Sequence, residues 1–192
     1  CSGGYPEYHY KGDCLDIIDG CTSFKTCDGI IHKINDCFDL VICHPPCTYL
    51  SFAGNKYLNI DKYGEKAIKR YELRENAFEF AMRLFNCNCE HVAMENPKGY
   101  INSKFRTPDH TINPFQFGDR YYKVTCLWLR GLPLLMPDYQ VLPPEPIYIQ
   151  ENGKKRFWVE TVKGSERAKL RSKTFPGIAR AIAWQFTNNF FI

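Results

Sequence analysis

The stretch that decides the expected fold is residues 38–47, FDLVICHPPC. Residues 38–43 are almost continuously apolar, which is typical of a parallel strand buried on both faces. Two prolines follow, and proline has no N–H group for a further ladder hydrogen bond. The sequence therefore predicts a short buried strand that ends in a stiff loop carrying Cys47.

A helical pattern and a second strand follow this loop. Apolar residues recur mostly at three- to four-residue steps from Glu65 to Phe85, which predicts an amphipathic helix. Its predicted solvent side holds Lys66, Lys69, Arg70, Glu72 and Arg74. A second apolar run, residues 91–94, ends in Glu95-Asn96-Pro97. Residues 38–97 thus predict a strand–helix–strand unit with two neighbouring parallel strands.

Further elements are expected downstream. Residues 124–129 have the composition of a strand, and residues 142–160 predict an inserted hairpin, with strands at 147–149 and 157–159 around an Asn-Gly turn. Residues 174–190 predict a C-terminal helix whose first turn begins at Pro176. We expect residues 1–192 to form a single domain.

Composition sets limits on the class of protein. With 192 residues, 44% hydrophobic and 15% aromatic, the chain can bury a core, so wholesale disorder is excluded. The longest apolar runs are too short to cross a bilayer, and no signal-peptide pattern opens the chain, so we expect no membrane partner and a cytoplasmic location. The formal charge of +4 is compatible with a polyanionic partner without requiring one.

The chain has ten cysteines but no CxxC pair. Several lie in apolar, strand-like runs, where buried free thiols behave as small hydrophobes, and this favours a reducing compartment. Cys87, Cys89 and His91 form a CxCxH run that offers an alternative, a metal site. We expect no metal.

The two predicted strand ends carry chemically useful side chains. Sites in parallel sheets form outside the carboxyl ends of the strands, so Cys47 and Glu95 are expected at one crevice. A thiolate attacks an electrophile, and a protonated carboxyl group donates a proton to the same substrate. The alternative is structural: Cys47 is a buried thiol and Glu95 caps a helix.

The motifs at these positions resemble those of a known family. The segment DLVICHPPCTYLS, residues 39–51, is similar to the catalytic-loop motif of the cytosine-C5 DNA methyltransferases, and Met94-Glu95-Asn96-Pro97 resembles their ENV motif. Gly12-Asp13 resembles the motif whose aspartate contacts the adenine of S-adenosylmethionine. From about residue 9 onward the chain looks like a compact methyltransferase-like group of phage and prophage genomes. The segments that carry this second resemblance are HPPCTYLSFAGNKYL, ENPKGYINSKFRTPD, NPFQFGDRYYKVTCLWLRGLP and RSKTFPGIARAIAWQ.

The resemblance implies a fold and a reaction. The fold would be an α/β, Rossmann-like methyltransferase domain of three layers with a mostly parallel sheet. Cys47 would attack C6 of a flipped cytosine while Glu95 binds N3, and the C5 carbon would take a methyl group from S-adenosylmethionine. Pro46 and Asn96 belong to the same catalytic motifs, and the prolines would fix the loop.

The resemblance also implies binding residues. The expected cofactor-binding residues are Asp13, Pro45, Pro176 and Gly177. The expected partner is double-stranded DNA, in the host cytoplasm if the chain is phage-encoded. The candidate DNA-binding residues are Ser51, Lys104, Arg106, Arg167, Arg171 and Lys173. The alternative for the basic run at 163–173 is a solvated loop.

The sequence departs from the family in its cofactor half-site. The glycine-rich loop and the acidic residue that bind S-adenosylmethionine in the family have no match, and the Gly3-Gly4 pair has no strand before it. The Arg-x-Arg motif of the family has no clear match either. We therefore expect an N-terminally incomplete domain with an incomplete cofactor half-site, from a fragment or a truncated gene product. The rival account is a natural cofactor-less remnant.

Two other functions remain open on sequence grounds. One is a pyrimidine-nucleotide-modifying enzyme that uses the same Cys/Glu pair without a DNA groove. The other is a non-catalytic binding or anti-restriction module that keeps the fold.

Overall fold

A computed structural model of the chain describes residues 7, 9–20, 23–34, 38–162 and 174–188. Its central sheet has four strands in the order β3 (Val41–Cys43), β4 (Val92–Asn96), β6 (Thr125–Arg130) and β5 (His110–Ile112). Strands β3 and β4 are parallel, with Val41 opposite Val92 and Cys43 opposite Met94. The prediction of two neighbouring parallel strands is confirmed.

The sheet is mixed, so the expectation of a mostly parallel sheet is wrong. Strand β6 runs antiparallel to both of its neighbours, β4 and β5. The reason lies in the connections: a parallel neighbour needs a long crossover, usually a helix. Residues 113–124, which join β5 to β6, contain just the short 3₁₀ helix η3 (Pro114–Gln116).

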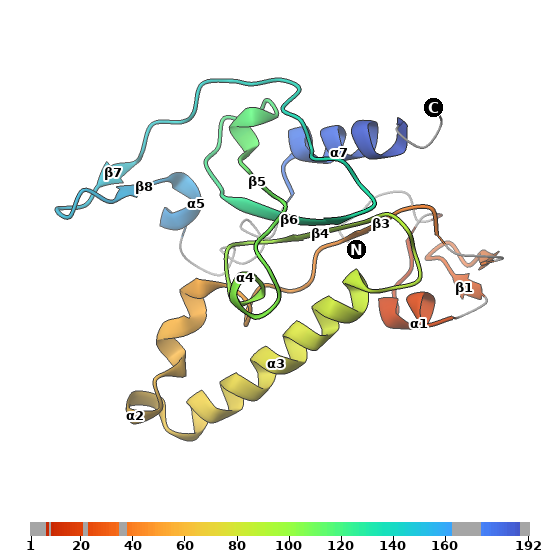
Figure 1. Cartoon of the computed structure of the whole chain (residues 1–192), viewed down its shortest axis with the longest axis horizontal. Coiled ribbons are helices and arrows are strands. Elements are labelled where there is room, and N and C mark those ends of the chain that lie inside the picture. The colour runs from red at the N-terminus through yellow and green to blue at the C-terminus, as the bar shows by residue number, and fades with distance from the viewer. Residues whose placement is uncertain (1–6, 8, 21–22, 35–37, 163–173, 189–192) are drawn as a thin grey trace.

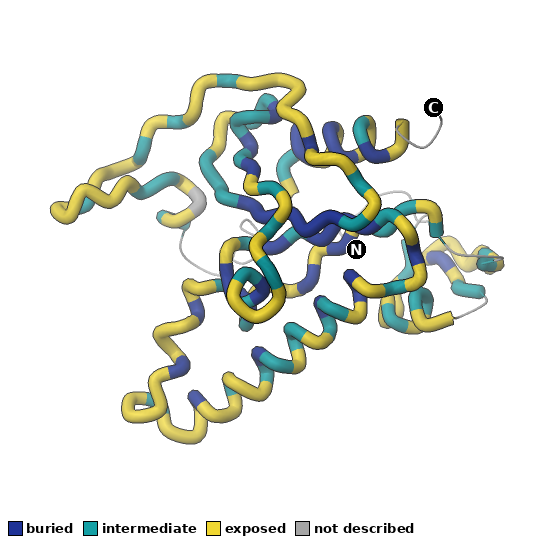
Figure 2. Tube along the Cα trace, in the orientation of Figure 1, coloured by how far each residue is buried: buried dark blue, intermediate teal, exposed yellow. Residues whose placement is uncertain are grey.

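Helices cover both faces of the sheet, giving a mixed α/β arrangement of three layers (Figure 1). Helix α3 (Glu65–Phe85) lies on one face and α7 (Pro176–Asn188) on the other. Successive residues of β4 point to opposite faces. Met94 therefore belongs to the core that contains Ala81 of α3, and Ala93 to the core that contains Ile178 of α7. Buried residues are concentrated along the central strands (Figure 2).

Both long helices agree with the sequence patterns. Helix α3 occupies the predicted 65–85 range, after Gly64, whose positive φ of 52° suits glycine. Helix α7 begins at the predicted Pro176, and Ile182 and Phe186 lie in the core beneath it.

The inserted hairpin is shorter than expected. Strands β7 (Tyr148–Ile149) and β8 (Lys155–Arg156) pair antiparallel around the predicted turn and project from the main body (Figure 1). Residues 157–159 do not form the expected second strand, because the short helix α5 (Trp158–Thr161) begins there. The Glu160 side chain accepts a hydrogen bond from the backbone N–H of Phe157 at 3.3 Å, which favours a helix start over a strand.

The remaining elements flank the sheet. Near the N-terminus, β1 (Ser23–Lys25) and β2 (Ile31–Lys33) form a separate antiparallel pair. The other short helices are α1 (Cys14–Ile18), η2 (Phe52–Leu58), α2 (Ile60–Tyr63) and α4 (Tyr100–Lys104). No helix in the described part of the chain is long and apolar enough to span a membrane.

The CxCxH run has contacts of its own in the fold. The Cys89 thiol lies 3.0 Å from the carbonyl oxygen of Phe38 and 3.2 Å from that of His91, so it links the segments that lead into β3 and β4. Within the described ranges, no group of three or more His, Cys, Asp or Glu side chains is placed to hold a metal ion.

Candidate active site

The parallel pairing of β3 and β4 brings their carboxyl-end loops to the same edge of the sheet. Because Cys43 lies opposite Met94, the next residues in register are His44 and Glu95. The Nδ1 atom of His44 lies 3.0 Å from Oε2 of Glu95, at hydrogen-bond distance. The Glu95 side chain is 20% exposed and that of His44 41% exposed, so solvent reaches this pair. Glu95 therefore has His44 as a partner, a residue that the sequence did not indicate as part of the site.

A buried amide holds the loop that carries the nucleophile candidate. The Nδ2 group of Asn96, which is 1% exposed, donates a hydrogen bond of 2.8 Å to the carbonyl oxygen of Pro45. Pro45 is buried, whereas Pro46 and Cys47 are exposed. Asn96 thus ties the His44–Cys47 loop to the end of β4 and leaves the cysteine at the surface.

Backbone contacts continue this attachment. Ser51 and Gly99 form an antiparallel bridge, and the Tyr100 N–H donates to the Leu50 carbonyl oxygen at 2.6 Å. A Cβ atom on Gly99 would lie 2.0 Å from that same oxygen, so the close approach requires glycine. The segments after β3 and β4 are therefore joined as one unit.

Cys47 is the accessible thiol of this unit. It is exposed, and its carbonyl oxygen accepts hydrogen bonds from the N–H groups of Leu50 and Ser51 at 3.1 and 3.0 Å. Cys43, four residues earlier, is buried, and desolvation raises its pKa to about 12. Cys43 is therefore a neutral apolar group at physiological pH, and the alternative of a buried thiol applies to it and not to Cys47.

Two arginines of α3 hold the segment after Cys47, a role that the sequence reasoning missed. The Nη2 group of Arg70 donates to the Thr48 carbonyl oxygen at 3.0 Å, and that of Arg74 to Oδ1 of Asn55 at 2.6 Å. Arg74 is 7% exposed, so its assignment to the solvent side of the helix is wrong, whereas Arg70 is partly buried. The available signal was their spacing of four residues, which places both on one face of a helix.

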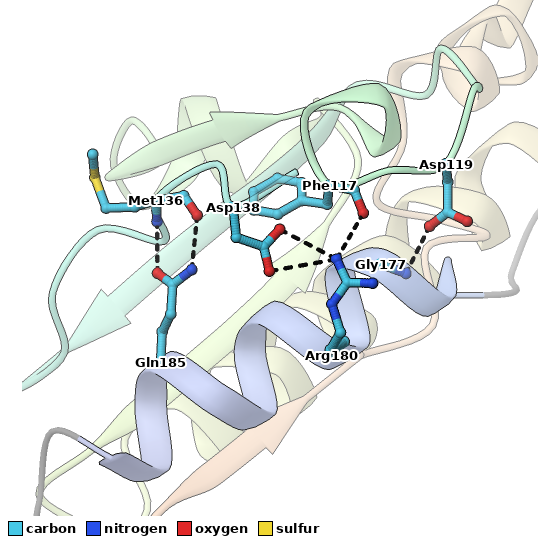
Figure 3. Close-up of polar contacts among 7 residues, drawn as sticks. All are labelled: Phe117, Asp119, Met136, Asp138, Gly177, Arg180 and Gln185. Carbon is cyan, nitrogen blue, oxygen red and sulfur yellow. Dashed lines mark hydrogen bonds and ion pairs between the residues drawn. The ribbon is translucent and has the colours of Figure 1, made fainter. Parts of the chain in front are cut away.

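The expected cofactor residues have other partners in the fold. The Asp13 carboxylate caps α1 by accepting a hydrogen bond of 2.9 Å from the Leu15 N–H. The Gly177 N–H donates to Oδ2 of Asp119 at 2.7 Å (Figure 3). A Cβ atom on Gly177 would lie 1.9 Å from the Phe117 carbonyl oxygen, so this glycine permits close packing of α7.

Other contacts of α7 strengthen this packing. Arg180 pairs with Asp138 at 3.3 Å, and Gln185 exchanges two hydrogen bonds of 2.8 and 2.7 Å with the backbone of Met136 (Figure 3). Pro176 and Gly177 therefore begin a firmly docked helix. These residues, with the buried Pro45, do not provide a fitting half-site for S-adenosylmethionine within the described part of the chain.

Three of the six candidate DNA-binding residues lie among the described residues, and each has contacts within the fold. Lys104 lies 3.6 Å from the Glu75 carboxylate. Ser51 lies beside Gly99, in the unit that carries Cys47. Arg167, Arg171 and Lys173 lie outside the described residues.

Arg106 has an internal role instead of a free guanidinium. It pairs with Asp109 at 2.7 Å and donates to the Leu129 carbonyl oxygen at 3.1 Å, while its own carbonyl oxygen accepts a hydrogen bond from Nε1 of the buried Trp128. Arg106 therefore holds the segment before β5 against β6.

The Arg106–Asp109 contact predicts a pH dependence of stability. Burial alone would raise the pKa of Asp109, but hydrogen bonds from Arg106 and from the Leu129 N–H outweigh it and hold this pKa below its ordinary value. A lowered folded-state pKa means that the carboxylate stabilises the fold above the unfolded pKa of about 3.9 and loses this effect as pH falls through the folded value.

We expect Asp109→Asn to lower the free energy of unfolding at pH 7 by about 1 kcal/mol, a modest value because the pair is partly exposed. The difference from wild type should shrink below about pH 4. Urea unfolding of both proteins at several pH values measures this difference in unfolding free energy. A difference that grows toward acid pH would contradict a lowered pKa for Asp109.

Comparison with known proteins adds no family. No family model matches the sequence, and searches of curated proteins and of solved structures find no match.

Proposed function

We propose that this chain is an enzyme like the cytosine-C5 DNA methyltransferases, with Cys47 as the nucleophile that adds to the base. One observation carries the proposal: an exposed thiol lies in the loop after β3, a partly exposed carboxylate lies near the carboxyl end of the neighbouring parallel strand β4, and Asn96 of β4 fixes the thiol's loop. The motif resemblance on residues 39–51 and 94–97 supports it. The finer proposal for the fold is a Rossmann-like methyltransferase domain, which the parallel pair and the helical layers on both faces support.

The chemistry begins with addition of the thiolate to the base. The Cys47 sulfur forms a bond to C6 of cytosine, and the electron pair of the C5–C6 double bond moves to C5 and into the ring toward N3. The carboxyl group of Glu95, in its protonated form, would donate a hydrogen bond to N3 and stabilise the negative charge that develops there. In a duplex the target base must first leave the stack, which costs a few kcal/mol.

Asn96 and the two prolines contribute by holding the loop. With the Pro45 carbonyl fixed at 2.8 Å from Asn96, the loop carrying the sulfur needs little further ordering before attack. S-Adenosylmethionine supplies the methyl group in such chemistry. The four expected cofactor residues do not form a fitting half-site in the described chain, so the residues present support base addition and not methyl transfer.

Exchange of the cytosine C5 hydrogen for deuterium tests this step without a methyl donor. After addition, C5 takes a deuteron from heavy water; loss of the original proton from C5 and departure of Cys47 then restore the ring with deuterium at C5. We expect exchange in a cytosine-containing oligonucleotide. Exchange in deoxycytidine monophosphate and not in the oligonucleotide would favour the free-nucleotide enzyme, and exchange in neither would contradict base addition.

A second candidate function has one specific observation in its favour. Since Asp13 and Gly177 are engaged in capping and packing, the chain also suits a non-catalytic module of methyltransferase-like fold.

Both accounts predict that the 192-residue chain binds S-adenosylmethionine weakly or not at all. The glycine turn and ribose-binding acid on which such folds rely have no match here. Isothermal titration measures the affinity, and micromolar binding at one site per chain would show that the cofactor residues are misassigned. Lack of cofactor binding together with lack of C5 exchange would favour the non-catalytic module.

A further inference from the structure

We propose that residues 52–71, which we call the arm, bind single-stranded DNA beside Cys47. The inference rests on the proposed function for its choice of DNA as ligand. It adds which surface of the protein binds the DNA, and that the bound DNA is single-stranded. The arm consists of η2, α2 and the first turns of α3, and it extends away from the sheet (Figure 1). Most of it is exposed (Figure 2).

The arm carries positive charge that the fold leaves available. Four exposed lysines lie along it, and none is within ion-pair distance, 4.0 Å, of a described carboxylate: Lys56, Lys62, Lys66 and Lys69. Lys104, by contrast, is paired with Glu75, and Arg106 with Asp109. Free lysines on a projecting element suit contacts with a phosphate backbone.

The arm also presents aromatic rings to solvent. Phe52 and Tyr57 are each 43% exposed and Tyr71 is 44% exposed. Two of the lysines lie near rings, Lys56 at 4.9 Å from the Tyr57 centroid and Lys62 at 5.5 Å from that of Tyr63. Exposed rings interleaved with cations form the usual platform for stacking bases while the backbone is neutralised. In a duplex the base faces are covered by neighbouring bases, so this surface fits unpaired nucleotides.

Two guanidinium groups connect the arm to the nucleophile loop. Arg70 donates to the carbonyl oxygen of Thr48, the residue after Cys47, and lies 5.0 and 5.3 Å from the ring centroids of Tyr49 and Tyr57. A Cβ atom on Gly54 would lie 2.4 Å from this guanidinium, so the glycine makes room for it. Arg74 holds Asn55 from beneath the same segment. A strand bound on the arm is thereby kept next to Cys47.

Fluorescence anisotropy with a labelled single-stranded oligonucleotide and the matching duplex tests the inference. We expect wild type to bind the single strand more tightly. The double variant Lys62→Gln/Lys66→Gln should weaken binding and reduce the slope of log K against log salt by about 0.7 for each lost phosphate contact. The ring variant Tyr71→Ala should weaken single-strand binding about five- to a hundredfold.

Matched controls lie on the β7–β8 hairpin. Lys154→Gln/Lys155→Gln removes two exposed charges there, and Tyr148→Ala removes a ring that is 50% exposed. We expect both to bind as wild type does. Circular dichroism and thermal melting establish that each variant is folded.

The outcomes separate this inference from the proposed function. Unchanged binding by both arm variants, an equal loss in the controls, tighter binding to the duplex, or no binding by wild type would overturn the arm. Binding does not require the thiol, so arm-dependent binding without C5 exchange would leave the arm standing while the enzymatic proposal fails. C5 exchange together with unchanged binding by the arm variants would support the enzymatic proposal and overturn the arm.

Discussion

Replacing Cys47 with serine is expected to abolish C5 hydrogen exchange in cytosine, with a loss of at least about a thousandfold. The alcohol of serine is far less acidic than a thiol, so little nucleophile is present at neutral pH. Because Cys47 is exposed, the substitution should change the free energy of unfolding by no more than about 0.5 kcal/mol. Mass spectrometry of the recovered oligonucleotide measures the exchange, and urea unfolding measures the stability.

Cys27→Ser is the matched control, since Cys27 is also an exposed free thiol and lies far from residue 47 in the sequence. It should retain wild-type exchange. If Cys47→Ser exchanges as fast as wild type, another group adds to the base. If both variants lose exchange equally, the loss comes from removing any exposed thiol and is not specific to Cys47.

Replacing Gly99 with alanine is expected to disrupt both stability and reaction. The added Cβ would lie 2.0 Å from the Leu50 carbonyl oxygen and 2.9 Å from the Ser51 Cα, so one backbone must move. That movement breaks the 2.6 Å hydrogen bond from the Tyr100 N–H to Leu50 and separates the Cys47 loop from the segment after β4. We expect a loss of about 2–4 kcal/mol in unfolding free energy, the range for overpacking with a lost buried hydrogen bond.

Gly153→Ala distinguishes this clash from a general cost of losing glycine. Gly153 has a φ of 77° but nothing within 4 Å of an added Cβ, so it carries backbone strain alone. We expect it to lose about 1 kcal/mol and to keep C5 exchange. Urea unfolding of the two variants provides the comparison, and equal losses would show that the contact at Gly99 is not decisive.

The local parts of the fold could be predicted because each rests on a strong nearby signal. The helical period of 65–85 matches α3 in full. The predicted strands 38–43 and 91–94 correspond to β3, which covers Val41–Cys43 alone, and to β4, which covers Val92–Asn96 and so includes Glu95. Their parallel pairing follows from the helix between them, which supplies the crossover that parallel strands need.

The direction of β6 and the end of the hairpin could not be predicted in the same way. Strand direction depends on which strands become neighbours, and the apolar pattern of 124–129 is the same in either direction. Residues 157–159 are rich in strand-forming types, yet the Glu160 contact to the Phe157 N–H starts a helix. A single side-chain hydrogen bond of this kind is not visible in periodicity.

Prediction of the site was similarly divided. The loop that bears Cys47 and the position of Glu95 near the carboxyl end of β4 could be predicted from the two apolar runs, whereas the His44–Glu95 contact depends on strand register. Arg70 and Arg74 have the charge of surface residues, and their burial follows from how the segment 48–58 folds over α3. Asp13 and Gly177 match family motifs in type, but capping and packing partners decide what they do here.

The central claim, that Cys47 adds to the base, is tested most directly by capture on an oligonucleotide containing 5-azacytosine. Thiol addition to C6 of this base is followed by protonation at the ring nitrogen that replaces C5, so an adduct accumulates without a methyl donor. Digestion and mass spectrometry then locate the modified peptide. We predict the adduct on Cys47 in the wild-type protein and none in Cys47→Ser. An adduct on another cysteine, or equal capture by the variant, would contradict the account.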